Sequence, residues 1–239
     1  MSGPFMTEDE LDALAADLRS GREVAAAGAL FDMDGTLVDS VPAVEASWRM
    51  VADEFGVPRL PATLHGLTAQ AVVVAAGIHP DHRERAAARL VEIESRPGQE
   101  LKALPGVRPF VDSLPEGHWG VVTSAPREVA RARYGAARLP RPAFFVTGDD
   151  VTAGKPDPEP FRKGLAALRA RGCAGVVVAV EDTVAGLRSA RGAGCLALGV
   201  PGTYRAAELS PHAHLVIDSF EVLRTRATDT GFSLLVALR

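Results

Sequence analysis

The chain has 239 residues, of which 47% are hydrophobic and 23% are charged, and its formal net charge at pH 7 is -4. This composition predicts a globular protein with one sizeable domain or a core with a smaller insert, and the acidic balance argues against a nucleic-acid partner. No apolar run reaches membrane-spanning length and the N-terminus is acidic, so we expect a cytoplasmic protein with no membrane partner.

Residues 1–25 form a predicted helical extension before the first strand. Thr7 and Glu10 have the spacing of a capping box, and Leu11 and Leu18 fall on one face of the helix that follows them. This apolar stripe needs a partner surface, and we expect the helix to pack on the core.

The apolar run 27–31 predicts a buried strand, and two carboxylates follow it directly. Asp32 and Asp34 stand two residues apart, so on an extended backbone they lie on the same side. Gly35 then allows a sharp turn. Like charges this close are unfavourable unless a cation lies between them, so the arrangement predicts a site for a divalent metal.

Residues 44–106 show helical patterns with little strand signal. Apolar residues recur at helical spacing between Val44 and Phe55, and further helices are predicted over 68–76 and 81–95. This block interrupts the chain just after the first strand. We therefore expect a helical cap that hangs over the carboxyl edge of a sheet, where ligand sites of α/β proteins lie.

From residue 107 onward, short apolar runs alternate with helix-length segments. The runs cover 119–122, 143–146, 176–180, 195–198 and 215–217. Continuous apolar strands with intervening helices indicate a parallel sheet covered on both faces. The predicted fold is α/β, with a Rossmann-like parallel sheet core built from residues 26–43 and 107–239 and with the helical cap, 44–106, inserted between them.

Three further groups of polar residues lie beyond predicted strands of this core. Ser124 follows the run 119–122, and Glu181 with Asp182 follows the run 176–180. Lys155 lies in the loop beyond the run 143–146. Each of them alone is a weak signal. Because the carboxyl ends of parallel strands share one edge, we expect all of them to meet the two carboxylates of the first motif there.

In this order the motifs resemble those of the haloacid dehalogenase-like hydrolases, in particular the phosphatases of that family, over about residues 29–199. The resemblance implies that Asp32 is the nucleophile and that Asp34 is the general acid and base. It also implies a Mg2+ ion held by Asp32, Asp182 and the backbone carbonyl of Asp34. Glu181 would orient a bound water or ligate the metal directly.

The same resemblance assigns the phosphate site. Ser124 and the amide of Ala125 would bind phosphoryl oxygens, and Lys155 would pair with both the phosphate and Asp32. Phosphoryl transfer depends mainly on positioning and charge neutralisation, so one divalent ion and one lysine would offset the phosphate and the carboxylates. A carboxylate nucleophile divides hydrolysis into two easier displacements.

Closer resemblance points to phosphatases of small sugar and polyol phosphates, whose typical substrates are glycerol phosphate, 2-deoxyglucose 6-phosphate and hexitol phosphates. It rests on Leu64-His65-Gly66 and on segments 104–107, 144–160 and 181–186. His65 is the candidate substrate contact of the cap, and the alternative is a structural turn histidine. The resemblance implies a basic residue just after His65-Gly66, where this chain has Leu67 and Thr68.

Two other functions compete with a phosphatase. A β-phosphoglucomutase-like phosphotransferase uses the same core but needs a cap cation for a second phosphate, and the matching position here is Ala69. A non-catalytic sugar-phosphate-binding regulator would have a degenerate site, whereas the catalytic positions are complete. We expect a phosphorylated sugar or polyol as the ligand and a monomer or homodimer as the assembly.

Cysteine and histidine residues form no second ligand pattern in the sequence. Cys173 and Cys195 are far apart and adjoin apolar runs, so we expect buried free thiols in a reducing compartment. The pair His212 and His214 lacks further ligand-type neighbours and is expected at the surface.

Overall fold

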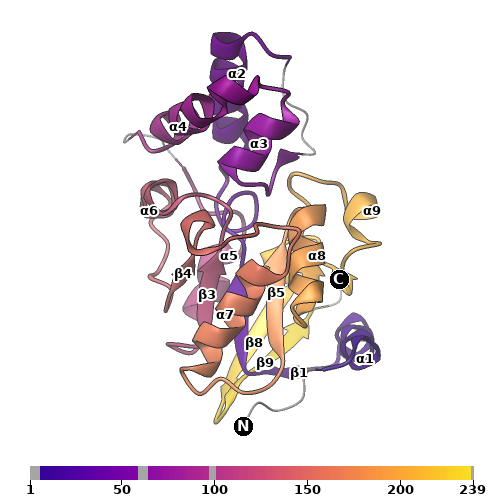
Figure 1. Cartoon of the computed structure of the whole chain (residues 1–239). Helices are drawn as coiled ribbons and strands as arrows, with labels where there is room; N and C mark the ends of the chain where they lie inside the picture. Colours follow the sequence, from indigo (N-terminus) through magenta and orange to yellow (C-terminus); the bar gives the residue numbers. More distant parts are fainter. Residues whose placement is uncertain (1–5, 59–63, 97–100, 238–239) are drawn as a thin grey trace.

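The computed structural model describes residues 6–58, 64–96 and 101–237. Helices α2 to α4 lie together at one end of the molecule, and the other helices and the strands form the larger body (Figure 1). The described helices are α1 (Glu8–Arg19), α2 (Val41–Phe55), α3 (Ala69–Ala75), α4 (Arg83–Glu94), α5 (Val107–Asp112), α6 (Arg127–Ala136), α7 (Glu159–Arg169), α8 (Val184–Gly192) and α9 (Ala206–Leu209), with 3-10 turns η2 (Pro80–His82), η3 (Gly148–Asp150) and η4 (Phe220–Val222).

The main sheet has six parallel strands in the order β4-β3-β2-β5-β6-β7, so the predicted α/β fold is confirmed. Its strands are β2 (Gly28–Phe31), β3 (Trp119–Val122), β4 (Phe145–Val146), β5 (Val177–Glu181), β6 (Leu196–Gly199) and β7 (Leu215–Val216). Strand β2 lies between β3 and β5. The residues that follow these three strands therefore meet at the middle of the carboxyl edge.

Helices cover both faces of this sheet, as the unbroken apolar strands predict. Ala29 and Phe31 of β2 face the apolar cluster that contains α1, α5 and part of α6, whereas Leu30 faces the cluster formed by α7, α8 and α9. The alternation follows from the two-residue period of a strand. Burial on both faces fixes the register of β2 and thereby the position of the residues after it.

A second, three-stranded antiparallel sheet in the order β1-β9-β8 was not predicted. It consists of β1 (Val24–Ala26), β8 (Leu223–Thr228) and β9 (Gly231–Val236). Strand β1 pairs with β9, so the segment before the first core strand is itself part of a sheet. Helix α1 contacts this sheet, begins at the predicted Thr7–Glu10 capping box and buries Leu11 in the core cluster, as expected.

Helices α2, α3 and α4 share an apolar cluster of their own, which includes Trp48, Val72 and Leu90. The two segments that join these helices to the core pair with each other. The Asp39 amide donates to the carbonyl of residue 102 at 2.8 Å, and the amide of residue 104 donates to the carbonyl of residue 37 at 3.1 Å. The chain thus enters and leaves the helical layer through one antiparallel pair, while the boundaries 44 and 106 of the cap stay a prediction.

The prediction that Cys173 and Cys195 are buried free thiols is confirmed. The prediction for His214 is wrong, because this side chain is buried and its Nδ1 accepts a hydrogen bond from the Ala197 amide at 2.9 Å. His214 lies against α1, with its Nε2 3.2 Å from Glu8 Oε1, and sequence spacing does not reveal this tertiary contact.

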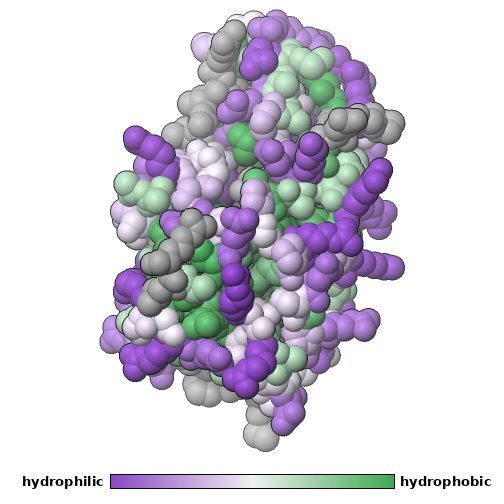
Figure 2. Space-filling model, turned by 180° about the vertical axis from the view of Figure 1, so that it is seen from behind, coloured by the Kyte–Doolittle hydropathy of each residue, from purple (hydrophilic) through white to green (hydrophobic). Residues whose placement is uncertain are grey.

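The surface is mostly hydrophilic, with apolar side chains in smaller groups between charged ones on the face shown in Figure 2. The large hydrophobic residues that are exposed in the described parts of the chain are Met50 and Val74. Within those same parts, no helix has both the length and the apolar character that crossing a membrane requires.

Candidate active site

Four predicted site residues converge in the interior at the carboxyl edge of the main sheet. Asp32 follows β2, Glu181 and Asp182 lie at the end of β5, and Lys155 comes from the loop before α7; all four are buried. One carboxylate oxygen from each of the three acids lies within 4.8 Å of the other two. The order of the strands thus brings together residues that are about 150 positions apart in the chain.

Lys155 is the cation within this cluster. Its Nζ donates to Asp32 Oδ1 at 2.5 Å, to Glu181 Oε1 at 2.6 Å and to the Val122 carbonyl at 3.0 Å. Burial alone would lower the pKa of Lys155, but Asp32 and Glu181 outweigh it and hold this pKa above its usual value. The lysine is therefore a permanent positive charge against the predicted nucleophile.

One lysine does not balance three buried carboxylates. Burial raises the pKa of Asp32 well above its usual range against the opposing effect of Lys155, and burial together with Glu181 raises the pKa of Asp182 to about 7. A further cation at this point would remove the excess negative charge. The donor atoms are all hard oxygens, a set that fits a divalent ion such as Mg2+.

The turn after Asp32 is shaped to approach Asp182 closely. Gly35 has a φ of +80°, and a Cβ atom at this position would collide with the Asp182 carboxylate. Thr36 Oγ1 donates to Asp182 Oδ1 at 3.2 Å, and the Thr203 amide donates to Oδ2 at 3.2 Å. These contacts fix the Asp182 carboxylate beside the β2 turn.

Asp34 points away from this cluster and into the space beneath the helical layer. Its Oδ1 accepts hydrogen bonds from Ser40 Oγ at 2.5 Å and from Arg133 Nη1 at 2.9 Å. Its side chain is 22% exposed, in contrast to the buried Asp32. Two donors on Oδ1 leave Oδ2 as the oxygen suited to carry a proton.

The two predicted phosphate ligands at the end of β3 have partners within the protein. Ser124 Oγ donates to the Gly66 carbonyl at 2.6 Å, and the Ala125 amide donates to Thr123 Oγ1 at 3.1 Å. The first bond joins the core to the α2–α3 connection. Gly66 permits this approach because a Cβ atom there would lie 2.7 Å from Thr183 Oγ1.

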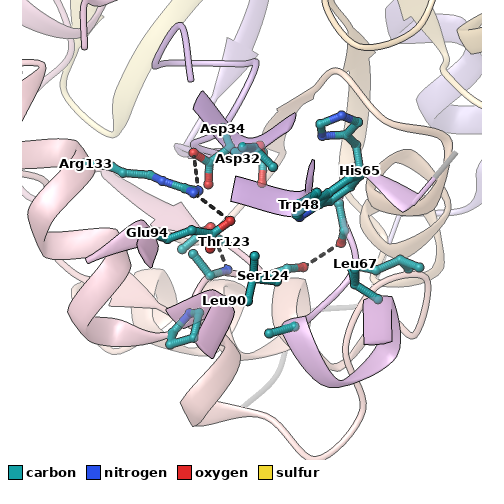
Figure 3. Close-up of a pocket in the computed structure, with 16 residues that line it drawn as sticks. Asp32, Asp34, Trp48, His65, Leu67, Leu90, Glu94, Thr123, Ser124 and Arg133 are labelled. Atoms are coloured by element: carbon teal, nitrogen blue, oxygen red, sulfur yellow. Dashed lines mark hydrogen bonds and ion pairs between the residues drawn. The ribbon is translucent and has the colours of Figure 1, made fainter. Parts of the chain in front are cut away.

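A cavity of about 60 Å³, room for a few water molecules, lies between the helical layer and the core. Asp32, Asp34 and Ser124 form its core side, and Trp48, Leu90 and Glu94 lie on the other side. Figure 3 shows these side chains around one space. An apolar wall with a few polar groups is the usual character of a small-molecule site.

His65, the predicted substrate contact of the cap, lines this cavity. Its ring stacks on Trp48 with 4.5 Å between the ring centroids, and its Nε2 is 3.7 Å from Glu45 Oε1. Among the described residues, this nitrogen has no hydrogen-bond partner. Burial lowers the pKa of His65 against the opposing effect of Glu45, so the ring is neutral at pH 7.

Arg133 and Glu94 are site residues that sequence reasoning missed. Arg133 of α6 is buried, contacts Asp34 through Nη1, and places Nη2 3.1 Å from Glu94 Oε1 at the end of α4 (Figure 3). Asp34 and Glu94 raise the pKa of Arg133 although burial opposes them. Burial raises the pKa of Glu94 to about 7 against the opposing effect of Arg133. Arg133 is one of several arginines on α6, so only the tertiary structure distinguishes it.

The comparisons with known proteins agree with this site. The family model of the haloacid dehalogenase-like hydrolases matches residues 27–194. Hexitol phosphatase A from Escherichia coli (strain K12) is 36% identical over 214 residues, which cover 85% of this chain and 96% of that protein. Glycerol-1-phosphate phosphohydrolase 1 from Saccharomyces cerevisiae is 31% identical over 189 residues, 74% of this chain and 75% of that protein.

A solved structure of a hydrolase from Pseudomonas syringae has a TM-score of 0.71 and 27% identity, and the match covers 81% of this chain and 94% of that one. The family match spans more than half of the chain and includes the segments after β2, β3 and β5. The two relatives match 85% and 74% of this chain. The chain therefore belongs to the haloacid dehalogenase-like hydrolases and is a phosphoric monoester hydrolase of that family.

Proposed function

We propose that the protein is a magnesium-dependent phosphatase that hydrolyses small sugar or polyol phosphate monoesters through an aspartyl-phosphate intermediate. The observation that carries this proposal is the buried cluster in which Lys155 holds Asp32 beside Glu181 and Asp182. Relatives named as hexitol and glycerol-1-phosphate phosphatases support the substrate class.

In this mechanism, Asp32 attacks phosphorus while Asp34 Oδ2 gives a proton to the leaving alkoxide. Asp34 then takes a proton from the water that attacks the aspartyl-phosphate. Lys155 offsets the charge on Asp32 and the phosphoryl oxygens, and Ser124 and the Ala125 amide bind those oxygens. Arg133 and the Ser40 hydroxyl keep Asp34 Oδ1 occupied throughout, which directs the proton to Oδ2.

The proposed metal ligands are Asp32, Asp182 and the backbone carbonyl of Asp34. A divalent ion held there would supply charge neutralisation at the phosphoryl group. Both Glu181 oxygens already accept hydrogen bonds, Oε1 from Lys155 and Oε2 from the Thr183 amide and hydroxyl. This arrangement favours a role for Glu181 in orienting Lys155 and bound water over direct ligation.

The cavity gives no support to the mutase alternative. A mutase must bind a second phosphate through the cap, and among the described residues the cap side of the cavity carries no lysine or arginine. Ala69 lines the cavity at the position where the resemblance expects the cation. The nearby Arg133 belongs to the core and is already paired with two carboxylates.

A phosphate-release assay tests the proposed function. The purified protein is incubated with glycerol phosphate, hexitol phosphates, 2-deoxyglucose 6-phosphate and p-nitrophenyl phosphate, with Mg2+ or with excess chelator. We expect phosphate release that depends on Mg2+. Release that is unchanged by the chelator would refute the metal mechanism, and the absence of release from every ester would refute the phosphatase proposal.

Magnesium should also raise the melting temperature, and it should do so more at about pH 8 than at about pH 5. Folding raises the pKa values of Asp32 and Asp182, so these groups contribute stability at low pH that is lost as the pH rises toward about 7. A divalent ion binds the ionised carboxylates and reverses this loss. Thermal scans with and without Mg2+ measure the effect, and Asp182→Asn should remove most of it. An equal gain at both pH values would contradict the assignment of the metal site.

His65→Ala should lower kcat/KM for the best polyol phosphate about ten- to hundredfold and affect p-nitrophenyl phosphate much less. We expect the unpartnered Nε2 to bind a substrate hydroxyl, and losing such a bond costs about 1–3 kcal/mol. His79→Ala, which changes an exposed histidine before η2, is the matched control. Equal losses on both substrates would mean that His65 shapes the cavity through Trp48 and does not read the substrate.

A further inference from the structure

The side of the cavity opposite His65 carries a chain of three charged groups, of which Arg133 and Glu94 are buried. Arg133 Nη1 is 2.9 Å from Asp34 Oδ1, and Arg133 Nη2 is 3.1 Å from Glu94 Oε1. Figure 3 shows His65 and Trp48 on one side of the space and Arg133 with Glu94 on the other. Glu94 ends α4 and Arg133 lies on α6, so the chain of charges crosses from the cap helices to the core.

The charge of Arg133 is divided between two carboxylates. An anionic group on a substrate would meet this guanidinium only together with the charges of Asp34 and Glu94, and like charges held this close repel. The arginine does not offer a free positive charge. A leaving group that carries a carboxylate or a second phosphate is therefore disfavoured at this side of the cavity.

A hydroxyl group suits the same place. Among the described residues, Arg133 Nε has no hydrogen-bond partner, and its Nη2 contacts Glu94 without hydrogen-bond alignment. Both atoms are buried donors in a side chain that is 4% exposed. A hydroxyl can accept from Arg133 and donate to Glu94 at once, which neither an anion nor an apolar group can do.

We propose that Glu94 and Arg133 determine the substrate specificity of this enzyme, reading a hydroxyl of the leaving group and excluding leaving groups with a second negative charge. The inference rests on the proposed phosphatase function and assigns its selectivity to a pair that joins α4 and α6. Arg133 also positions Asp34, so Glu94 is the member of the pair that can be changed without touching the catalytic acid.

Glu94→Gln and Glu94→Asp separate the binding of a hydroxyl from the exclusion of a second negative charge. Glu92→Gln is the matched control. Glu92 lies on the same helix, is half exposed and pairs with Arg89 and Arg96. The substrates are glycerol phosphate, 2-phosphoglycolate, whose leaving group carries a carboxylate, and p-nitrophenyl phosphate, which has no hydroxyl to read. Steady-state kinetics at about pH 8 with Mg2+ give kcat and KM for each.

For Glu94→Gln we expect about a tenfold loss of kcat/KM on glycerol phosphate, mainly through KM, because the charged acceptor is gone. On 2-phosphoglycolate we expect about a tenfold gain, since Arg133 then keeps one carboxylate partner and can pair with the substrate. Glu94→Asp keeps the negative charge but places the carboxylate further from the cavity, because the side chain is one methylene shorter. This variant should lose activity on glycerol phosphate without gaining activity on 2-phosphoglycolate. Activity on p-nitrophenyl phosphate should fall less than activity on glycerol phosphate, because p-nitrophenyl phosphate has no hydroxyl for Glu94 to bind.

Equal losses on all three substrates, or no change on any, would overturn the assignment, because a residue that only holds α4 in place would act on every substrate alike. The activity of the wild-type enzyme distinguishes failure of the proposed function from failure of the specificity inference. If it releases no phosphate from any ester, the proposed function fails. If it hydrolyses the esters and the Glu94 variants match Glu92→Gln, the specificity inference alone fails.

Discussion

Asp34→Asn should yield an enzyme that takes up phosphate and retains it, whereas Asp32→Asn should take up none. Asp32 is the buried carboxylate beside Lys155 and the predicted nucleophile, so its amide cannot form the acyl phosphate. Asn at position 34 cannot take a proton from water, and loss of acid–base catalysis lowers turnover by roughly 10²–10⁴. Intact-protein mass spectrometry after mixing with a substrate measures the covalent phosphate.

The two variants control for each other, since they make the same chemical change two residues apart. p-Nitrophenyl phosphate has a better leaving group, which departs without protonation by a general acid. It should therefore let Asp34→Asn form the aspartyl-phosphate and make the trapped intermediate easier to observe. Covalent phosphate on Asp32→Asn would overturn the assignment of the nucleophile. A phosphate-free Asp34→Asn protein that hydrolyses at the wild-type rate would remove Asp34 from the mechanism.

Lys155→Met should destabilise the fold and abolish activity together. The Lys155 side chain is fully buried, and its removal would leave Asp32 and Glu181 without their cation. Removing one partner of a buried ion pair costs about 3–5 kcal/mol. The loss should shrink at low pH, where the remaining carboxylates take up protons, because burial already raises the pKa of Asp32.

Denaturant unfolding of Lys155→Met at several pH values measures this effect, with Lys163→Met as the control. Lys163 lies on α7 with its side chain 45% exposed and pairs with Glu159, so its removal should cost less than about 1 kcal/mol. A Lys155→Met protein as stable as the wild type at neutral pH would show that the charges of Asp32 and Glu181 are neutralised by another route.

The core could be predicted because its signals are local. An unbroken apolar run followed by polar residues marks a buried parallel strand and its carboxyl end, so the sequence alone predicts that Asp32, Ser124 and Asp182 lie at one edge of the sheet. The second sheet was missed for a related reason. Strand β1 has three residues and pairs with β9, about 200 positions later, so nothing near it in the sequence indicates a partner.

The same limit explains the site residues that sequence reasoning missed. The contact of Arg133 with Glu94 depends on how the helical layer sits on the core, and neither residue adjoins a recognisable motif. Ser40 follows the first motif closely, but its hydroxyl reaches Asp34 only because the chain doubles back after Gly35. Position along the chain predicted which residues reach the edge of the sheet. It did not predict which helix residues face them.

The pairing of the two connecting segments has a consequence for how this architecture could arise. Residues 37 and 104 are hydrogen-bonded neighbours, so excising everything between them leaves a gap the width of one antiparallel pair. A hairpin turn of two residues spans such a gap. The segment inserted between these residues does not affect the strand order of the main sheet, because all strands other than β2 follow later in the chain. A lineage could therefore exchange one inserted cap for another at this point and keep Asp32, Lys155, Glu181 and Asp182 in place.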